Sequence, residues 1–235
     1  MAQALADARV DAVYSYAGRT ETPMGQPIHM RVGGFGGVEG LTAYLRDGAF
    51  THVIDATHAF AAQISSNAVA ACAVTGIPLI AYERMPWAQG DGDQWSRVPD
   101  IAAAALALGT APQQVFLAIG RQHLDAFASQ PQHHYLLRLV DPPLGPLPLP
   151  LAAVIIARGP FTAAGDTALL RQHGVQIVVA KNAGGKGAVA KIAAARALQL
   201  PVIMIDRPPI PARATARTAA TVMDWLDHQP ARLGV

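Results

Sequence analysis

The sequence has little cysteine, little charge and few aromatic residues, and each scarcity excludes a class of protein. A single cysteine, Cys72, in 235 residues allows neither an internal disulfide framework nor a zinc site built from several cysteines. We expect Cys72 to be a small buried side chain, because its neighbours in NAVAACAVTG are small. The net charge is +2 and only 14% of the residues are charged. Without a basic stripe we expect no nucleic-acid partner, and no metal-ligand motif is present.

Long apolar runs are also missing. No uninterrupted run reaches the roughly 18 residues that a membrane-spanning helix needs. The start, MAQALADARVD, lacks the basic and then apolar segments of a secretory signal. We therefore expect a cytoplasmic protein with no membrane partner. Since 51% of the residues are hydrophobic, the chain is too apolar for a disordered protein, and it is long enough for one large domain or two small ones.

Apolar strand-like runs alternate with helical patterns along the chain. Nine runs predict strands, at 10–18, 27–34, 51–58, 77–84, 113–122, 133–141, 152–161, 175–182 and 201–208. Helices are predicted at 38–46, 60–75, 100–108, 162–173, 187–198 and 215–228, with Asp100 as an N-cap. Continuous apolar strands between helices are typical of α/β proteins with parallel sheets covered on both faces. Nine strands suit two small doubly wound sheets, and we place the boundary in the loop at 110–114.

Ligands of open parallel sheets bind beyond the carboxyl ends of the strands. Nearly every predicted strand here ends in glycine, a basic residue or both, which favours a polyanionic ligand. In the first half the strand ends supply Gly18, Arg19, Thr20, Gly33, Gly34, Phe35, Gly36, Asp55, Thr57 and His58. In the second half they supply Arg121, Arg158, Gly159, Lys181, Asn182, Gly184, Gly185 and Lys186.

Each of these residues also has a purely structural interpretation. The glycines at 33–37 can serve a turn with positive φ, and His58 can be a hydrogen-bonded residue near a helix start. Lys181 and Asn182 can cap the end of their strand. The cations that can be solvated surface charges are Arg19, Arg121, Arg158, Lys186 and Lys191.

One residue bears on the choice of cofactor. In a dinucleotide fold, an acid at the end of the second strand binds the ribose 2′-hydroxyl, whereas an arginine accommodates a 2′-phosphate. YSYAGRT places Arg19 there and no acid. This favours NADP over NAD.

Taken together, seven motifs resemble one family in order and spacing. AGRT, RVGGFGG, IDATHAFA, LAIGRQ, ARGPF, KNAGGKG with KIAAARAL, and LPVIMIDRP resemble the precorrin-6A reductase family of corrin-ring biosynthesis. The likeness runs from about Val10 to the final helix. It implies two Rossmann-like domains, NADPH as hydride donor, and reduction of a ring double bond of the tetrapyrrole precorrin-6A to precorrin-6B on the route to cobalamin.

The resemblance also divides the chain and its candidate residues. Residues 1–112 would form the NADP-binding domain and 113–235 the substrate domain. The cofactor residues would be Gly18, Arg19, Thr20, Gly33, Gly34, Phe35, Gly36, Asp55 and Thr57. The substrate residues would be Arg121, Arg158, Gly159, Lys181, Asn182, Gly184, Gly185 and Lys186. His58 or a bound water would donate the proton that accompanies the hydride.

The sequence departs from the family pattern at two places. Family members open with a strand and a Gly-rich turn that holds the pyrophosphate, whereas this sequence starts inside the helix that follows, at MAQALADARV. We therefore expect the first domain to lack that strand and turn. The family's KNSGG appears with Ala183 in place of serine. Because Arg19 marks the first domain as the cofactor side, KNAGGKG is expected to hold substrate carboxylates.

Two other functions fit the same pattern. One is a carrier that binds an anionic tetrapyrrole without chemistry, and NADPH oxidation that depends on the tetrapyrrole would exclude it. The other is a nucleotide-sugar or methyl transferase on a similar α/β scaffold, which the fold alone does not exclude. Binding of S-adenosylmethionine or a sugar nucleotide, without NADPH binding, would favour it.

Overall fold

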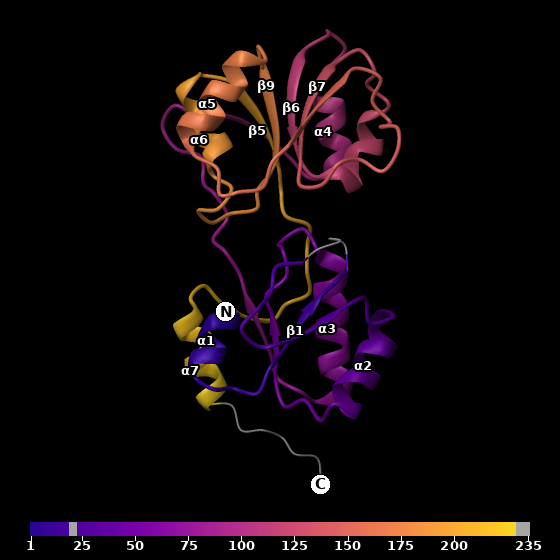
Figure 1. Cartoon of the computed structure of the whole chain (residues 1–235), viewed down its shortest axis with the longest axis vertical. Coiled ribbons are helices and arrows are strands. Elements are labelled where there is room, and N and C mark those ends of the chain that lie inside the picture. The colour runs from indigo at the N-terminus through magenta and orange to yellow at the C-terminus, as the bar shows by residue number, and fades with distance from the viewer. Residues whose placement is uncertain (19–22, 229–235) are drawn as a thin grey trace. The chain divides into compact units, whose positions relative to one another are not determined.

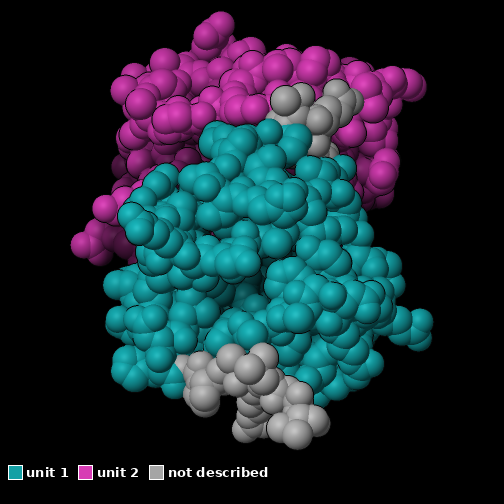
Figure 2. Space-filling model, turned by 60° about the horizontal axis from the view of Figure 1, so that its bottom comes forward, with its two compact units in different colours: residues 1–83, 209–235 teal, residues 84–208 magenta. Residues whose placement is uncertain are grey.

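The chain consists of two compact units. A computed structural model describes residues 1–18 and 23–228. Unit 1 combines Met1–Glu83 with Pro209–Val235, and unit 2 is Arg84–Pro208 (Figure 2). The chain therefore leaves the first unit, builds the second and returns.

Unit 2 is built on one six-stranded parallel sheet in the order β5-β10-β9-β6-β7-β8. Its strands are β5 (Gln94–Val98), β6 (Gln114–Ala118), β7 (His134–Leu139), β8 (Ala152–Ile156), β9 (Ile177–Lys181) and β10 (Pro201–Ile205). Helices α5 (Ala163–Gln172) and α6 (Ala190–Ala197) cover one face and α4 (Ile101–Ala107) the other (Figure 1). A 3-10 segment, η1 (Arg121–Phe127), follows β6. Because all strands run parallel, their carboxyl ends share one edge.

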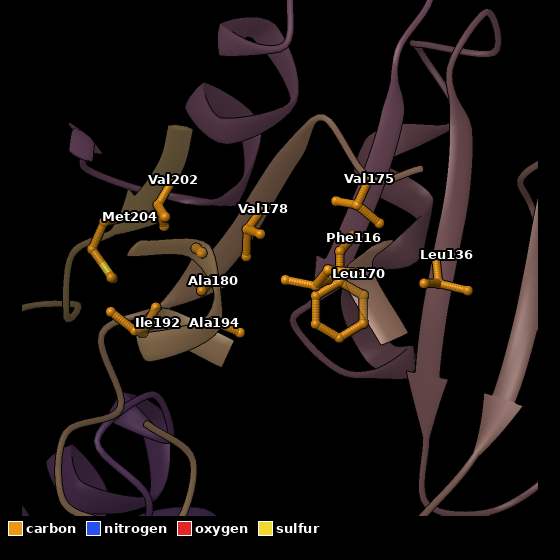
Figure 3. Packing of buried hydrophobic residues seen from close by; sticks show 11 residues of the cluster. Phe116, Leu136, Leu170, Val175, Val178, Ala180, Ile192, Ala194, Val202 and Met204 are labelled. Carbon is orange, nitrogen blue, oxygen red and sulfur yellow. The ribbon is translucent and has the colours of Figure 1, made fainter. Parts of the chain in front are cut away.

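The core of unit 2 explains why its central strands β6, β9 and β10 are mostly apolar. All five residues of β9 are buried. Phe116 of β6, Val178 of β9 and Met204 of β10 are completely buried and belong to one cluster with Ile192 of α6 (Figure 3). A sheet covered on both faces leaves no solvent side for polar residues. Each such side chain stabilises the fold by roughly 1.5–3 kcal/mol.

Unit 1 holds two smaller parallel sheets. β1 (Val13–Tyr16) pairs with β2 (His29–Val32), and β3 (Val53–Asp55), β4 (Leu79–Tyr82) and β11 (Ala214–Ala216) pair in the order β11-β4-β3. Helices α1 (Ala2–Asp7) and α7 (Ala219–His228) lie on one side, and α2 (Gly37–Asp47) and α3 (Ala62–Thr75) on the other (Figure 1). Among residues 1–18 and 23–228, no strand joins the two sheets.

The predicted fold class is confirmed, and two strands are added to it. Each of the nine predicted runs contains a strand, and Asp100 caps α4 by accepting a 2.8 Å hydrogen bond from the Ala103 N–H. The stretch that forms β5 lies between the predicted strand 77–84 and the predicted helix 100–108, and the final helix was predicted from Thr215, which lies in β11.

Because of these two short strands, the two units do not divide between residues 112 and 113, as the sequence predicted for the two domains. β5 pairs with β10, so the chain from Arg84 onward belongs to unit 2. β11 pairs with β4, so the segment from Pro209 belongs to unit 1. Backbone pairing with a distant strand, rather than position along the chain, decides membership of a unit.

Neither a membrane-spanning helix nor a cluster of metal ligands is found in the described part of the chain. None of its helices is long and apolar enough to cross a lipid bilayer. Within the same residues, no three side chains of histidine, cysteine, aspartate or glutamate gather as metal ligands would.

Candidate functional site

The carboxyl ends of β1 and β2 bring two predicted cofactor residues together. Gly18 has a φ of +77°, and a Cβ there would lie 3.4 Å from the Cα of Gly33. The Gly33 N–H donates to the Tyr16 carbonyl at 2.9 Å, which continues the pairing of the two strands. The positive φ at both positions, +77° at Gly18 and +127° at Gly33, explains a glycine at both strand ends. Arg19 and Thr20 lie outside the described residues.

Arg31 organises this edge, and sequence analysis did not single it out. Its guanidinium carbon lies 3.9 Å from the centroid of the Phe35 ring. Nη1 donates to Ser15 Oγ at 2.8 Å and to the Gly33 carbonyl at 2.9 Å, and Nη2 donates to the Gly34 carbonyl at 3.2 Å. One planar cation therefore joins β1, β2 and the glycine loop. The available signal was a basic residue two positions before a double glycine at a strand end.

The glycine loop leads directly into α2. Gly36 is the left-handed N-cap residue of this helix, and Gly37 is also left-handed, at +82°. No atom lies within 4 Å of a Cβ built on Gly34, Gly36 or Gly37. The first N–H groups of a helix carry partial positive charge and attract anions. An open glycine backbone at a helix start fits the phosphate-bearing part of a dinucleotide.

Asp55 and Thr57, at the end of β3, make their polar contacts with other residues of unit 1. The buried Asp55 Oδ1 accepts hydrogen bonds from the Thr57 N–H at 3.2 Å and from Thr57 Oγ1 at 2.8 Å. Asp55 Oδ2 lies 3.6 Å from Nε of Arg213, which also pairs with Glu83. Both carboxylate oxygens thus face protein groups, so Asp55 shapes the 55–58 turn.

His58, in the same turn, is exposed. Its Nδ1 accepts a 3.2 Å hydrogen bond from the Phe60 N–H, and the two rings lie 5.9 Å apart. An Nδ1 that accepts leaves the proton of the neutral imidazole on Nε2. In the neutral ring, Nε2 is therefore the nitrogen that carries the proton.

The edge of unit 2 gathers the predicted substrate cations. Lys181 ends β9, Arg121 follows β6, the neighbouring strand, and Arg158 follows β8 two strands further along. Arg121, Arg158 and Lys186 are exposed, whereas Lys181 is buried. Arg158 lies 3.5 Å from Asp141. Gly159, the next residue, is exposed as well.

A hollow of about 240 Å³ adjoins Arg121. Its walls are Leu124 and Asp125 of η1 and the proline-rich loop 143–148. The lining combines apolar walls with a guanidinium and a carboxylate.

The 182–188 turn is packed against the 84–87 segment. Asn182 Oδ1 accepts from the Trp87 N–H at 2.8 Å, and Asn182 Nδ2 donates to the Trp87 carbonyl at 3.0 Å. A Cβ on Gly184 would lie 2.1 Å from the Met85 carbonyl oxygen, and one on Gly185 would lie 2.7 Å from Arg84 Cδ. Both glycines also have φ near +70°. The Asn182 side chain and the two glycines therefore hold the turn in place.

Lys191 is buried, whereas the sequence allowed it to be a solvated surface charge. Only 7% of Lys191 is exposed, and its Nζ donates to the Ala188 carbonyl at 2.7 Å. Nζ also lies 5.1 Å from the centroid of the Trp87 ring. Burial lowers the pKa of Lys191 from 10.5 to about 8; the charge of Arg138 acts in the same direction and that of Asp166 in the opposite one. The sequence pattern of the predicted helix 187–198 did not indicate that Lys191 would be buried.

Comparisons with known proteins agree with one another. The family model described as Precorrin-6x reductase CbiJ/CobK matches residues 1–227. "Precorrin-6A reductase" of Rhodobacter capsulatus is 61% identical over 236 residues, covering 100% of this chain and 94% of the relative. A relative of the same name from Sinorhizobium sp is 47% identical over 201 residues, covering 86% and 77%. The solved structure "CobK precorrin-6A reductase" is similar with a TM-score of 0.94 and 62% identity, covering 100% of this chain and 94% of that one.

Proposed function

This chain belongs to the precorrin-6x reductase family CbiJ/CobK, and we propose that unit 1 binds the nicotinamide cofactor while unit 2 binds the tetrapyrrole. The family's reaction is the reduction of precorrin-6A in cobalamin biosynthesis, an oxidoreduction at a CH–CH group. The 61% identity over the whole chain to a precorrin-6A reductase carries this conclusion. It also favours the reductase over the carrier and the transferase.

The reaction needs a nicotinamide cofactor, and we infer that it is NADPH. Arg19 and the absence of an acid in YSYAGRT support a 2′-phosphate. Gly18, Gly33, Gly34, Phe35 and Gly36 would line the cofactor, with Arg31 holding their loop. Asp55 and Thr57 would act by fixing the turn that follows β3. When bound, the cofactor supplies a hydride.

His58 would deliver the proton that completes the reduction. The donor has to be the imidazolium, which would give up the Nε2 proton and be left neutral with its remaining proton on Nδ1. The hydrogen bond from the Phe60 N–H to Nδ1 would be absent in that protonated form. A bound water is the alternative donor.

Unit 2 would hold the carboxylate side chains of the macrocycle. Exposed guanidinium and ammonium groups along one edge of the sheet suit a ligand with many carboxylates. Arg121, Arg158 and Lys186 are exposed for this contact, and Lys181 lies at the base of the same edge. The hollow beside Arg121 offers apolar walls for part of the ring. Asn182, Gly159, Gly184 and Gly185 would shape the backbone around it.

The test is NADPH oxidation in the presence and absence of precorrin-6A. We expect oxidation that requires the tetrapyrrole, with NADH a poorer donor.

Arg121→Met combined with Arg158→Met should raise KM for the tetrapyrrole and leave the Kd of NADPH unchanged. Tetrapyrrole binding without turnover would support the carrier. A raised Kd for NADPH in the double variant would overturn the assignment of the units. The cytoplasmic location stays a prediction.

A further inference from the structure

The chain uses lysine in one place only. Its three lysines, Lys181, Lys186 and Lys191, fall within eleven consecutive residues, and its other side chains that are cationic at neutral pH, histidine aside, are arginines. Lysine differs from arginine in carrying a compact charge on a flexible stem with three donors. The three lysines differ in their surroundings, because Lys186 is exposed whereas Lys181 and Lys191 are buried. Lys191 has no place in the function derived above.

Lys191 is one of three side chains that bind the carbonyl groups of the 182–188 turn. Arg207 donates from Nε to the Asn182 carbonyl at 3.0 Å and from Nη2 to the Ala183 carbonyl at 3.1 Å. Trp87 donates from Nε1 to the Gly185 carbonyl at 2.8 Å. Lys191 donates to the Ala188 carbonyl at 2.7 Å. Four carbonyls of one turn are thus held by donors of unit 2.

This arrangement bears on anion binding. Carbonyl oxygens carry partial negative charge and repel carboxylates, so a turn that binds carboxylates has to direct its carbonyls elsewhere. The ammonium of Lys191 also lies near the Trp87 ring, an attractive contact between a cation and an aromatic face. Trp87 in turn is bonded to Asn182 and Gly185. One lysine therefore supports the turn at Ala188 directly and at two further points through Trp87.

We propose that Lys191 is a positioning residue for substrate, which fixes the 182–188 turn so that Lys186 and the turn's backbone meet a carboxylate of the tetrapyrrole. The proposal rests on the assignment of the substrate to unit 2. Lys191 does not touch the ligand, because its ammonium is buried against Ala188 and Trp87. Its effect is on the geometry of the turn.

The experiment compares Lys191→Met, which keeps the stem and loses the donor, with Lys191→Arg, which keeps charge and donors. The chain has three tryptophans, so an ¹⁵N spectrum has three indole signals, and loss in Trp87→Phe identifies that of Trp87. We expect Lys191→Met to move this signal and to raise KM for precorrin-6A about 10- to 100-fold. The kcat and the Kd of NADPH should stay within about twofold. Lys191→Arg should recover part of both effects.

Two other variants separate the possible failures. Lys186→Met should raise KM without moving the Trp87 signal, and Arg171→Met, which removes an exposed cation of α5, should change neither. Suppose that Lys186→Met raises KM for precorrin-6A but Lys191→Met does not. The positioning role of Lys191 is then overturned, whether or not the Trp87 signal moves, and the assignment of the substrate to unit 2 stands. If Lys186→Met and Lys191→Met both leave KM unchanged, unit 2 is not the substrate side and the proposed function fails with it.

Discussion

His58 has one ring nitrogen bound by its own turn and the other oriented by that bond. If Nε2 donates the proton, His58→Ala should lower kcat by about 10²- to 10⁴-fold, the usual contribution of a general acid. KM for both ligands should change little, and single-turnover rates measured from pH 5 to 9 should lose the limb that reports the histidine. The control is His58→Gln, which keeps a polar side chain. Undiminished turnover in both variants would assign the proton to water.

Lys191 gives a prediction about stability that is independent of substrate. In the unfolded chain the ammonium keeps its proton up to pH 10.5, whereas in the fold the pKa is about 8 because of burial and the nearby Arg138 cation, partly offset by Asp166. Between these values the unfolded state binds more protons. Stability therefore rises with pH across this window.

The measurement is the free energy of unfolding of the wild type minus that of Lys191→Met, at pH 7 to 10.5. The difference should shift by about 1–3 kcal/mol in favour of the wild type as pH rises. Cys72 and Tyr135, whose pKa values are raised by burial to about 11 and about 12, have the opposite effect. They are present in both chains, so their effect cancels in the difference. A difference that does not change with pH would mean that Lys191 keeps its ordinary pKa.

At the scale of the elements, Arg213 fixes β11 in unit 1. Its side chain is buried, pairs with Glu83 and lies 3.6 Å from the Asp55 carboxylate. Removing one partner of a buried ion pair leaves charge uncompensated and costs about 3–5 kcal/mol. Arg213→Met should destabilise unit 1 by about 3 kcal/mol, measured by urea unfolding, with faster hydrogen exchange in Ala214–Ala216. Arg217→Met removes an exposed cation just after β11 and should have little effect; an equal loss in both variants would contradict the prediction.

The elements also show how far the sequence could predict the structure. β9 was predictable because four consecutive apolar residues, Ile177 to Ala180, precede Lys181 in a strand that is buried along its whole length. β5 was not, because Gln94–Val98 is an edge strand with polar residues on its exposed side. β11 has only three residues. Both are defined by pairing with strands about a hundred residues away, which local patterns do not record.

The same limit applies to the candidate site. Parallel strands place their carboxyl ends at one edge, so the gathering of Arg121, Arg158 and Lys181 followed from the predicted topology. The pairing of Asn182 with Trp87 joins residues 95 positions apart, and the burial of Lys191 depends on that packing. Such contacts arise from tertiary packing, so the sequence alone does not indicate them.

At the scale of the whole molecule, the two units differ in their cores. Among the described residues, the largest fully buried side chains all belong to unit 2, Tyr135, Phe116 and Phe127 first among them. Unit 1 relies on smaller clusters, one around Leu41 and Leu45 and one around Ile80 and Val222, and its strands are divided between two sheets. Stability follows buried apolar area. Unit 1 should therefore unfold at a lower urea concentration than unit 2.

This difference allows the cofactor to be assigned to a unit. A ligand that binds only the folded form stabilises it by about 2.7 kcal/mol at a concentration 100 times its Kd. If unit 1 binds NADPH, the cofactor should raise the urea midpoint of unit 1 and leave that of unit 2 in place. Hydrogen exchange read by mass spectrometry separates peptides of residues 1–83 from those of 84–208. NADH at the same concentration is the control, and a smaller shift with NADH would support recognition of the 2′-phosphate. A shift confined to residues 84–208 would place the cofactor in unit 2 and reverse the proposed assignment.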